Sequence, residues 1–175
     1  MSVLRRGVVR PFEGIHPQLA ADVFVAEGAA VVGDVHIGAS SSVWYGTVLR
    51  GDTMPVRVGA RSNLQDLSVV HITTNVSGTF IGDEVTVGHR VILHACSIGD
   101  RVLVGMGAIV LDEAVVEREV IIGAGSLVPP RARLQSGHLY LGSPAKRIRP
   151  LRDNDFAMIE AGWRAYVDLG RRHAL

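Results

Sequence analysis

Aliphatic residues return at every sixth position along most of the chain. One such series contains Val25, Val31, Ile37, Val43 and Leu49. Neither the helical period of about 3.6 residues nor the two-residue alternation of a strand produces a repeat of six. The pattern predicts a solenoid of short strands, in which each repeat forms one flat side and three repeats close a triangular coil.

The same series resumes after two interruptions. Its later members are Val58, Leu64, Val70, Ile81, Val87, Leu93, Ile98, Val104, Val110, Val116, Ile122 and Val128. A glycine often follows the aliphatic residue and lets the chain turn closely. We expect the aliphatic side chains to point inward and successive coils to stack at the strand spacing of about 4.8 Å.

The pattern changes near the C-terminal end of the chain. The segment SPAKRIRPLRDNDF ends the repeats with two prolines and several charges. Beyond it, Asp153 or Asn154 can cap a helix. The apolar face of this helix would contain Phe156, Ile159, Trp163, Tyr166 and Val167. We predict one structural unit, with a β-helix over residues 1–150 and a helix over residues 151–175 packed on the solenoid.

Two interruptions of the repeat indicate loops. The step from Leu49 to Val58 is nine residues, so RGDTMPVR contains three extra residues and is expected to bulge. The step from Val70 to Ile81 is eleven residues, and HITTNVSGTF reads as one side of the coil with a five-residue insertion. The alternative is to count Val76 as another inward residue. With the insertion, Val70 and Leu93 occupy the same side of adjacent coils.

Three histidines fall at related places on these coils. His71 follows Val70 and His94 follows Leu93, so the two become equivalent positions on adjacent coils. Imidazoles one coil apart can approach closely enough to bind a tetrahedral zinc ion, whose bonds to nitrogen are about 2.0–2.1 Å. His89 lies about 16 Å from His94 at the rise of an extended strand. A single chain therefore offers an incomplete metal site, which is complete if another copy presents its His89, as a three-fold assembly would allow.

Composition and charge exclude several classes of protein. A chain of 175 residues suits one domain, and a net charge of +1 gives no strong field that would attract nucleic acid or an acidic membrane. No apolar stretch has the length of a signal peptide or of a membrane-spanning helix. The single cysteine, Cys96, cannot form an internal disulfide. We expect a cytoplasmic protein that binds neither nucleic acid nor a membrane.

The chain contains RGD at 50–52, NLQD at 63–66, His71, GHRVILH at 88–94 and GSPAK at 142–146. Together these motifs resemble those of the gamma-class carbonic anhydrases and their bacterial relatives, over nearly the whole chain. The spacing NxQDxxxxH…GHxxxxH is specific, whereas the hexapeptides and GSPAK also occur in acyltransferases. The resemblance implies a mainly β fold, the left-handed parallel β-helix, and a homotrimer.

The resemblance also implies the chemistry of the site. His71 and His94 of one subunit and His89 of its neighbour would hold zinc, and Fe(II) also suits three imidazoles. A metal-bound hydroxide would hydrate carbon dioxide reversibly to bicarbonate. The expected partners are this small substrate and two further copies of the chain.

Five other residues match positions near the metal in that family. Gln65 matches a glutamine that hydrogen-bonds metal-bound water, and Asn63 matches the asparagine beside it. Arg50 and Asp66 match an ion pair across the interface, although both residues could instead be purely structural. Gln65 and Asn63 could likewise be hydrogen-bonded only to a corner of the solenoid. Tyr140 is a weaker match to a tyrosine near the site.

Active members of the family carry glutamates in loops near the metal, and one of these glutamates transfers protons. Neither RGDTMPVR nor HITTNVSGTF contains glutamate. We therefore expect modest activity.

Two other functions remain open from the sequence. A hexapeptide acyltransferase that uses acyl-CoA needs one histidine as general base and a groove for the pantetheine arm. A non-catalytic scaffold would keep metal only to stabilise its trimer. Three histidines in ligand positions argue against the acyltransferase, and a hydration assay separates the enzyme from the scaffold.

Overall fold

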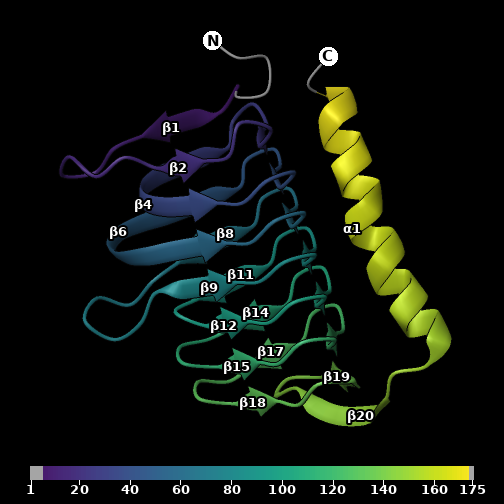
Figure 1. The fold of residues 1–175 in the computed structure, drawn as a ribbon. Helices are drawn as coiled ribbons and strands as arrows, with labels where there is room; N and C mark the ends of the chain where they lie inside the picture. The colour runs from purple at the N-terminus through teal and green to yellow at the C-terminus, as the bar shows by residue number, and fades with distance from the viewer. Residues whose placement is uncertain (1–5, 174–175) are drawn as a thin grey trace.

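The structure is a computed structural model that describes residues 6–173, which form a β-solenoid with one long helix beside it (Figure 1). Each coil has three flat sides, and equivalent strands of successive coils pair in parallel. The predicted mainly β solenoid with a C-terminal helix is confirmed.

The first side is a sheet of parallel strands that ends in one antiparallel strand. Its strands in spatial order are β3 (Phe24–Val25), β5 (Ser42–Val43), β7 (Asn63–Leu64), β10 (Thr86–Val87), β13 (Leu103–Val104), β16 (Ile121–Ile122), β19 (His138–Leu141) and the antiparallel β20 (Lys146–Pro150). Basic residues and a proline in β20 discourage further strands from pairing with this edge.

The second and third sides belong to one sheet, because β4 (Ala30–Ile37) and β6 (Val48–Val58) cross the corner between them. The other strands of the second side are β1 (Val8–Arg10), β8 (Val69–His71), β11 (Ile92–His94), β14 (Ile109–Val110) and β17 (Leu127–Val128). Those of the third side are β2 (Gln18–Leu19), β9 (Thr79–Ile81), β12 (Ser97–Ile98), β15 (Val115–Val116) and β18 (Arg133–Leu134).

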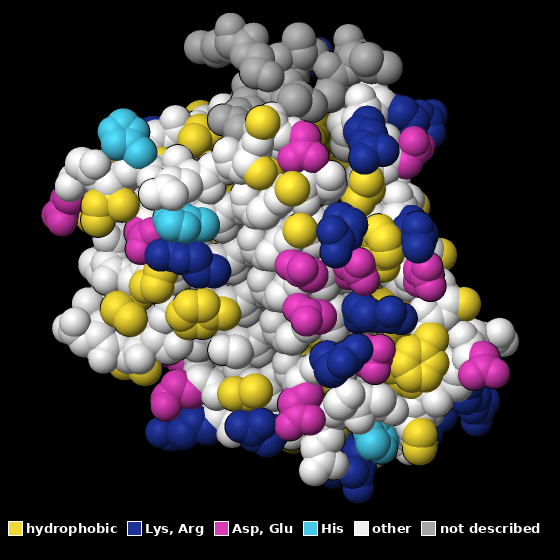
Figure 2. Space-filling model, in the orientation of Figure 1, with side chains coloured by type: hydrophobic (Ala, Val, Ile, Leu, Met, Phe, Trp, Pro, Cys, Tyr) yellow, Lys and Arg dark blue, Asp and Glu magenta, His cyan; other side chains and the backbone are white. Residues whose placement is uncertain are grey.

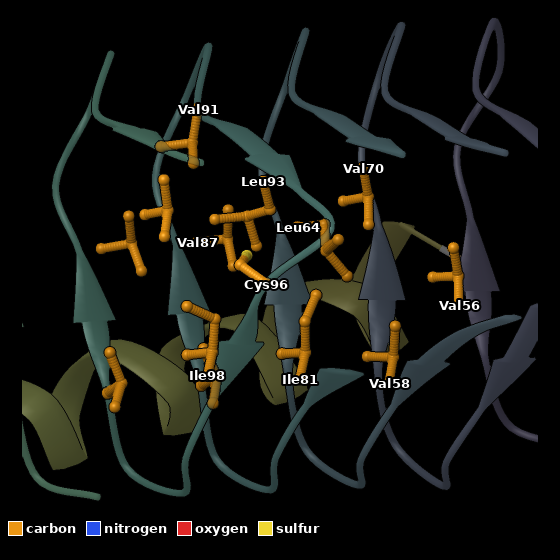
Figure 3. Close-up of a cluster of buried hydrophobic side chains, with 14 of the residues drawn as sticks. Val56, Val58, Leu64, Val70, Ile81, Val87, Val91, Leu93, Cys96 and Ile98 are labelled. Carbon is orange, nitrogen blue, oxygen red and sulfur yellow. The ribbon is translucent and has the colours of Figure 1, made fainter. Parts of the chain in front are cut away.

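The aliphatic residues of the repeat point into the solenoid and form its core, as Figure 3 shows for Val70, Val87 and Leu93. The in-register column of the first side contains Val25, Val43, Leu64, Val87, Val104, Ile122 and Tyr140, all buried. Cys96 packs in the same core, and burial raises the pKa of its thiol to about 12. Each layer is small, so the stacking of neighbouring coils supplies most of the apolar contact.

Both interruptions of the repeat leave the solenoid where the sequence predicted. Gly33 of β4 pairs with Gly51 of β6, and Val35 pairs with Val56. Between these pairs β4 has one residue and β6 has four, residues 52–55, so β6 bulges by three residues. The second interruption forms a loop over residues 72–78, between β8 and β9. Val76 in this loop is 52% exposed, so the alternative that made it an inward residue is wrong.

Helix α1 (Asp153–His173) lies along the first side and contacts β5, β7 and β10. Ile159 and Trp163 of the predicted apolar face are buried. The sequence predicted Asp153 or Asn154 as the cap, but the helix already begins at Asp153, so Arg152 occupies the cap position. The carboxylate of Asp155, the third residue of the helix, accepts the backbone N–H of Arg152 at 2.7 Å. A hydrogen bond from Arg149 is the main cause that lowers the pKa of Asp155 to about 2.

The surface carries mixed charge. On the face seen in Figure 2, basic and acidic side chains are interspersed, in keeping with the net charge of +1. Over residues 6–173, no helix is both long and apolar enough to cross a membrane.

Candidate metal centre

His71 and His94 lie side by side on adjacent coils. Strands β8 and β11 are parallel, and their register places His71 directly opposite His94. The ring centroids are 5.5 Å apart, and the ring planes meet at 74°. The predicted equivalence of the two positions is thus confirmed, and the pair occupies the corner between the second and third sides.

Both rings are held through the same nitrogen. The Nδ1–H of His71 donates to the carbonyl oxygen of Arg50 at 2.9 Å. The Nδ1 of His94 lies 2.8 Å from Oδ1 of Asp112, which can only accept when ionised. A proton fixed on Nδ1 leaves the lone pair of Nε2 free to bind a metal.

His89 lies at the opposite end of the second side, in the corner that follows β10. Its Nδ1 is 2.7 Å from Oδ2 of Asp66, so the third imidazole is oriented in the same way as the other two. In the part of the chain that the structure describes, no hydrogen bond is made by Nε2 of His71, His89 or His94. All three rings therefore present the same nitrogen as a potential ligand.

The single chain brings together two of the three predicted ligands. Among residues 6–173 there is no group of three His, Cys, Asp or Glu side chains that could hold a metal ion. His71 and His94 lie together at one corner, and His89 lies at the other corner. One chain thus carries two candidate half-sites, His71 with His94 and His89 by itself.

Asn63 and Gln65 lie on the His89 side of the coil. Both are buried, and the Nε2 of Gln65 donates to Oδ1 of Asn63 at 3.1 Å. Asn63 in turn donates to the hydroxyl of Thr86 at 3.1 Å. Gln65 directly precedes Asp66, the partner of His89, so in an assembly Gln65 and His89 would come from the same copy.

Arg50 and Asp66 have different partners within the chain. Arg50 pairs with Asp52, and Asp66 pairs with His89. Burial raises the pKa of Asp52, but the charge of Arg50 and a backbone hydrogen bond outweigh this effect and lower the pKa below its usual value. Arg50 is at the His71 corner and Asp66 at the His89 corner, so a pair between them requires two copies and stays a prediction.

Tyr140 does not lie near the histidines, and its assignment is corrected. It occupies the inward position of the last coil, where it pairs with Ile122, three strands beyond β10 in the sheet. Its hydroxyl accepts the backbone N–H of Gln135 at 2.8 Å. The spacing could have shown this, because Tyr140 continues the inward column eighteen positions after Ile122.

Two residues that lie near the site, Tyr166 and Asp112, were not identified as such from the sequence. Tyr166 of α1 packs edge-on against Trp44, and burial together with the charge of Asp66 raises the pKa of its hydroxyl. Asp112 contacts His94, but the register pairs Leu93 with Val110, seventeen positions on, so coil counting points to Leu111 and would have missed Asp112 by one residue. No periodic signal places Tyr166, because its position depends on how α1 docks.

No protein-family model matches the chain. The chain is 47% identical over 90% of its length to Gamma carbonic anhydrase 2, mitochondrial, of Arabidopsis thaliana, but it spans only 59% of that relative. It is 43% identical to Carbonic anhydrase of Geobacillus kaustophilus, over 94% of this chain and 90% of that one. The crystal structure of a hexapeptide transferase family protein from Anaplasma phagocytophilum matches with a TM-score of 0.91 and 41% identity, over 95% of this chain and 98% of that chain.

Proposed function

The chain belongs to the gamma carbonic anhydrase family, and from this membership and the geometry of its histidines we propose that it hydrates carbon dioxide reversibly to bicarbonate. The site would hold a divalent metal at the interface between two copies of the chain. The observation that carries the proposal is the common orientation of three imidazoles, each held at Nδ1, in two complementary half-sites.

The donor set fits a metal ion. Three neutral imidazoles suit zinc, and also ferrous iron, and leave one coordination position open. The carboxylates of Asp66 and Asp112 and the carbonyl of Arg50 fix the tautomers without occupying Nε2. When bound, the metal would supply the Lewis acidity that makes a water molecule nucleophilic near neutral pH.

The outer surface of the second side supports a trimer. Its outward residues form one in-register row of aliphatic side chains, Val48, Val69, Ile92, Ile109 and Leu127. We call this row the apolar face. Val69 and Ile92 are 38% and 37% exposed in the single chain, which is costly for a row of apolar residues in water.

A second copy is the natural partner of the apolar face, because a half-site lies at each end of it. If the same side of three copies faces a common axis, the His89 corner of each copy meets the His71 corner of the next. Such a head-to-tail contact closes into a ring under three-fold symmetry. The apolar face and the metal site would then be completed by the same assembly.

The chain's own residues would also assist the reaction. The amide of Gln65 has two N–H groups, and Asn63 accepts one of them. The other N–H and the carbonyl oxygen of Gln65 remain for substrate or water, so Gln65 can stabilise the negative charge that develops on the substrate oxygen. Without a glutamate in either loop, proton transfer depends on buffer, so the rate should be modest.

The test combines three measurements on protein purified without chelator or oxygen. We expect a particle of three 18.7 kDa chains, about one divalent metal per chain, and stopped-flow hydration that rises with buffer concentration. A monomer that binds one metal per chain would refute the interface site. A metallated trimer that is no faster than the free metal ion at any buffer strength would refute the enzyme and favour the scaffold.

The acyltransferase stays an alternative, because the similar Anaplasma protein is described as a hexapeptide transferase. Acyl transfer from acyl-CoA would need no metal, so metal removal distinguishes the two. A cytoplasmic location stays a prediction from the sequence.

A further inference from the structure

Asp112 connects a predicted metal ligand to an inserted loop. It follows β14, one coil beyond His94. Its Oδ1 lies 2.8 Å from Nδ1 of His94, and its Oδ2 accepts a hydrogen bond from the hydroxyl of Thr73 at 2.5 Å. Both oxygens of one carboxylate are therefore used, one by the ligand and one by the loop over residues 72–78.

That loop is itself joined to the bulge of β6. The hydroxyls of Thr53 and Thr74 are 2.7 Å apart. Gly78 lies so close to β6 that a Cβ atom there would be 2.3 Å from the carbonyl oxygen of Pro55. The bulge and the loop thus pack as one unit, which meets the histidine pair through Thr73 and Asp112.

We propose that Asp112 is a positioning residue, which holds His94 in the Nδ1–H tautomer and couples its ring to the inserted loop through Thr73. This role rests on the proposed function, since it prepares Nε2 of His94 for the metal. A carboxylate that accepts from the far nitrogen of a ligating imidazole fixes the ring and raises its basicity.

His71 and His94 are held by different kinds of hydrogen-bond partner. His71 donates to a backbone carbonyl, which the strand itself keeps in place. His94 depends on side chains alone: its Nδ1 lies 2.8 Å from Asp112, on another coil, and 3.4 Å from the hydroxyl of Thr73, which donates to the same Asp112.

The first test uses the metal-free protein labelled with ¹⁵N-histidine. NMR of wild type should show His94 protonated at Nδ1. Asp112→Ala should give a mixture of both tautomers, whereas Asp112→Asn keeps an acceptor oxygen and should preserve the Nδ1–H form. Unchanged tautomers in Asp112→Ala would overturn the proposal.

The second test measures zinc affinity by competition with a chromogenic chelator. Asp112→Ala should weaken binding roughly 10–100-fold. Thr73→Val should weaken it less, and Thr73→Ser, which restores the hydroxyl, should return it to the wild-type value. The matched control is Glu113→Gln, which removes a charge from the same turn and should leave zinc affinity unchanged.

The outcomes separate this proposal from the proposed function. Wild-type zinc affinity in Asp112→Ala would overturn the positioning role, whatever the protein catalyses. A wild-type trimer that binds zinc and responds to these variants, but hydrates no carbon dioxide, would refute the enzyme and retain the positioning role.

Discussion

Two corners of the same coil differ in how they present histidine. The corner with His89 is regular, and its tight turn requires a left-handed residue, Arg90, with φ of 59°. The corner with His71 and His94 is irregular, because the bulge at 52–55 and the loop at 72–78 leave the solenoid there. We refer to these as the regular corner and the loop corner.

The difference shows where a repeat fold can build a site. At the regular corner one residue per coil is displayed, and a single ligand with its carboxylate partner fits the repeat unchanged. At the loop corner, the insertions add Thr73 beside His94, and Thr74 joins the loop to Thr53 of the bulge, so several polar groups can gather near one position. Each coil contacts only its neighbours, so insertions here leave the rest of the stack intact.

The largest expected effect comes from removing a ligand at either corner. His89→Ala and His94→Ala should each lose nearly all bound metal and hydration activity, since two imidazoles hold zinc poorly. Metal content by atomic spectroscopy and stopped-flow assays would measure this. The same variants can show whether the two corners belong to different copies.

Mixing these two variants tests that directly. In trimers reassembled from equal amounts, about a quarter of the interfaces combine an intact loop corner with an intact regular corner. Metal and activity should return to about that fraction of wild type. If metal and activity do not return after proven subunit exchange, the two corners do not combine across copies, and the assignment of one site to two copies is wrong.

The next effect concerns the apolar face that separates the corners. Ile92→Asp puts a charge in the middle of that face and should turn the trimer into monomers, with loss of metal as a consequence. Sedimentation velocity would follow the mass. The control is Ser97→Asp, at an outward position on the third side, which should leave the trimer and its metal intact.

A smaller effect on the hydration rate is expected from adding a glutamate to the loop at the loop corner. Ser77→Glu adds an acid–base group to the loop and should raise the hydration rate by about tenfold at low buffer concentration. This is less than the roughly 10²–10⁴-fold of a well-placed group, because the added side chain has no built position. Asn75→Glu tests a second position in the same loop, whose φ of 60° is one that Glu84 and Glu113 also adopt. Equal rates for both variants and wild type would mean that the loop does not approach the reacting centre.

The smallest effect is expected at Cys96, which is near His94 in sequence. Cys96→Ala should keep full metal content and cost only about 1 kcal/mol of stability, as for a small loss of core packing. Metal loss in this variant, with the fold intact by circular dichroism, would show that the thiol takes part in the site.

The sequence by itself determined the coils and the position of each residue on them. The six-residue period placed His71 opposite His94, and its interruptions located both loops. The same count, carried further, places Tyr140 in the core, although the family resemblance had assigned this residue to the site. It does not place Asp112, because Leu93 pairs with Val110, seventeen positions on, and the count therefore puts Leu111 opposite His94. The other positions are predictable because parallel coils repeat in register, so sequence distance converts directly into height along the stack.

Only the tertiary structure decided the contacts that do not follow the repeat. Helix α1 docks along the first side, and only that docking brings Tyr166 near Asp66. The insertions carry no periodic signal, so the joining of Thr53 to Thr74 and of Thr73 to Asp112 could not be read from spacing. Such contacts depend on side-chain rotamers and on the packing of segments distant in sequence, which hydrophobic periodicity does not encode.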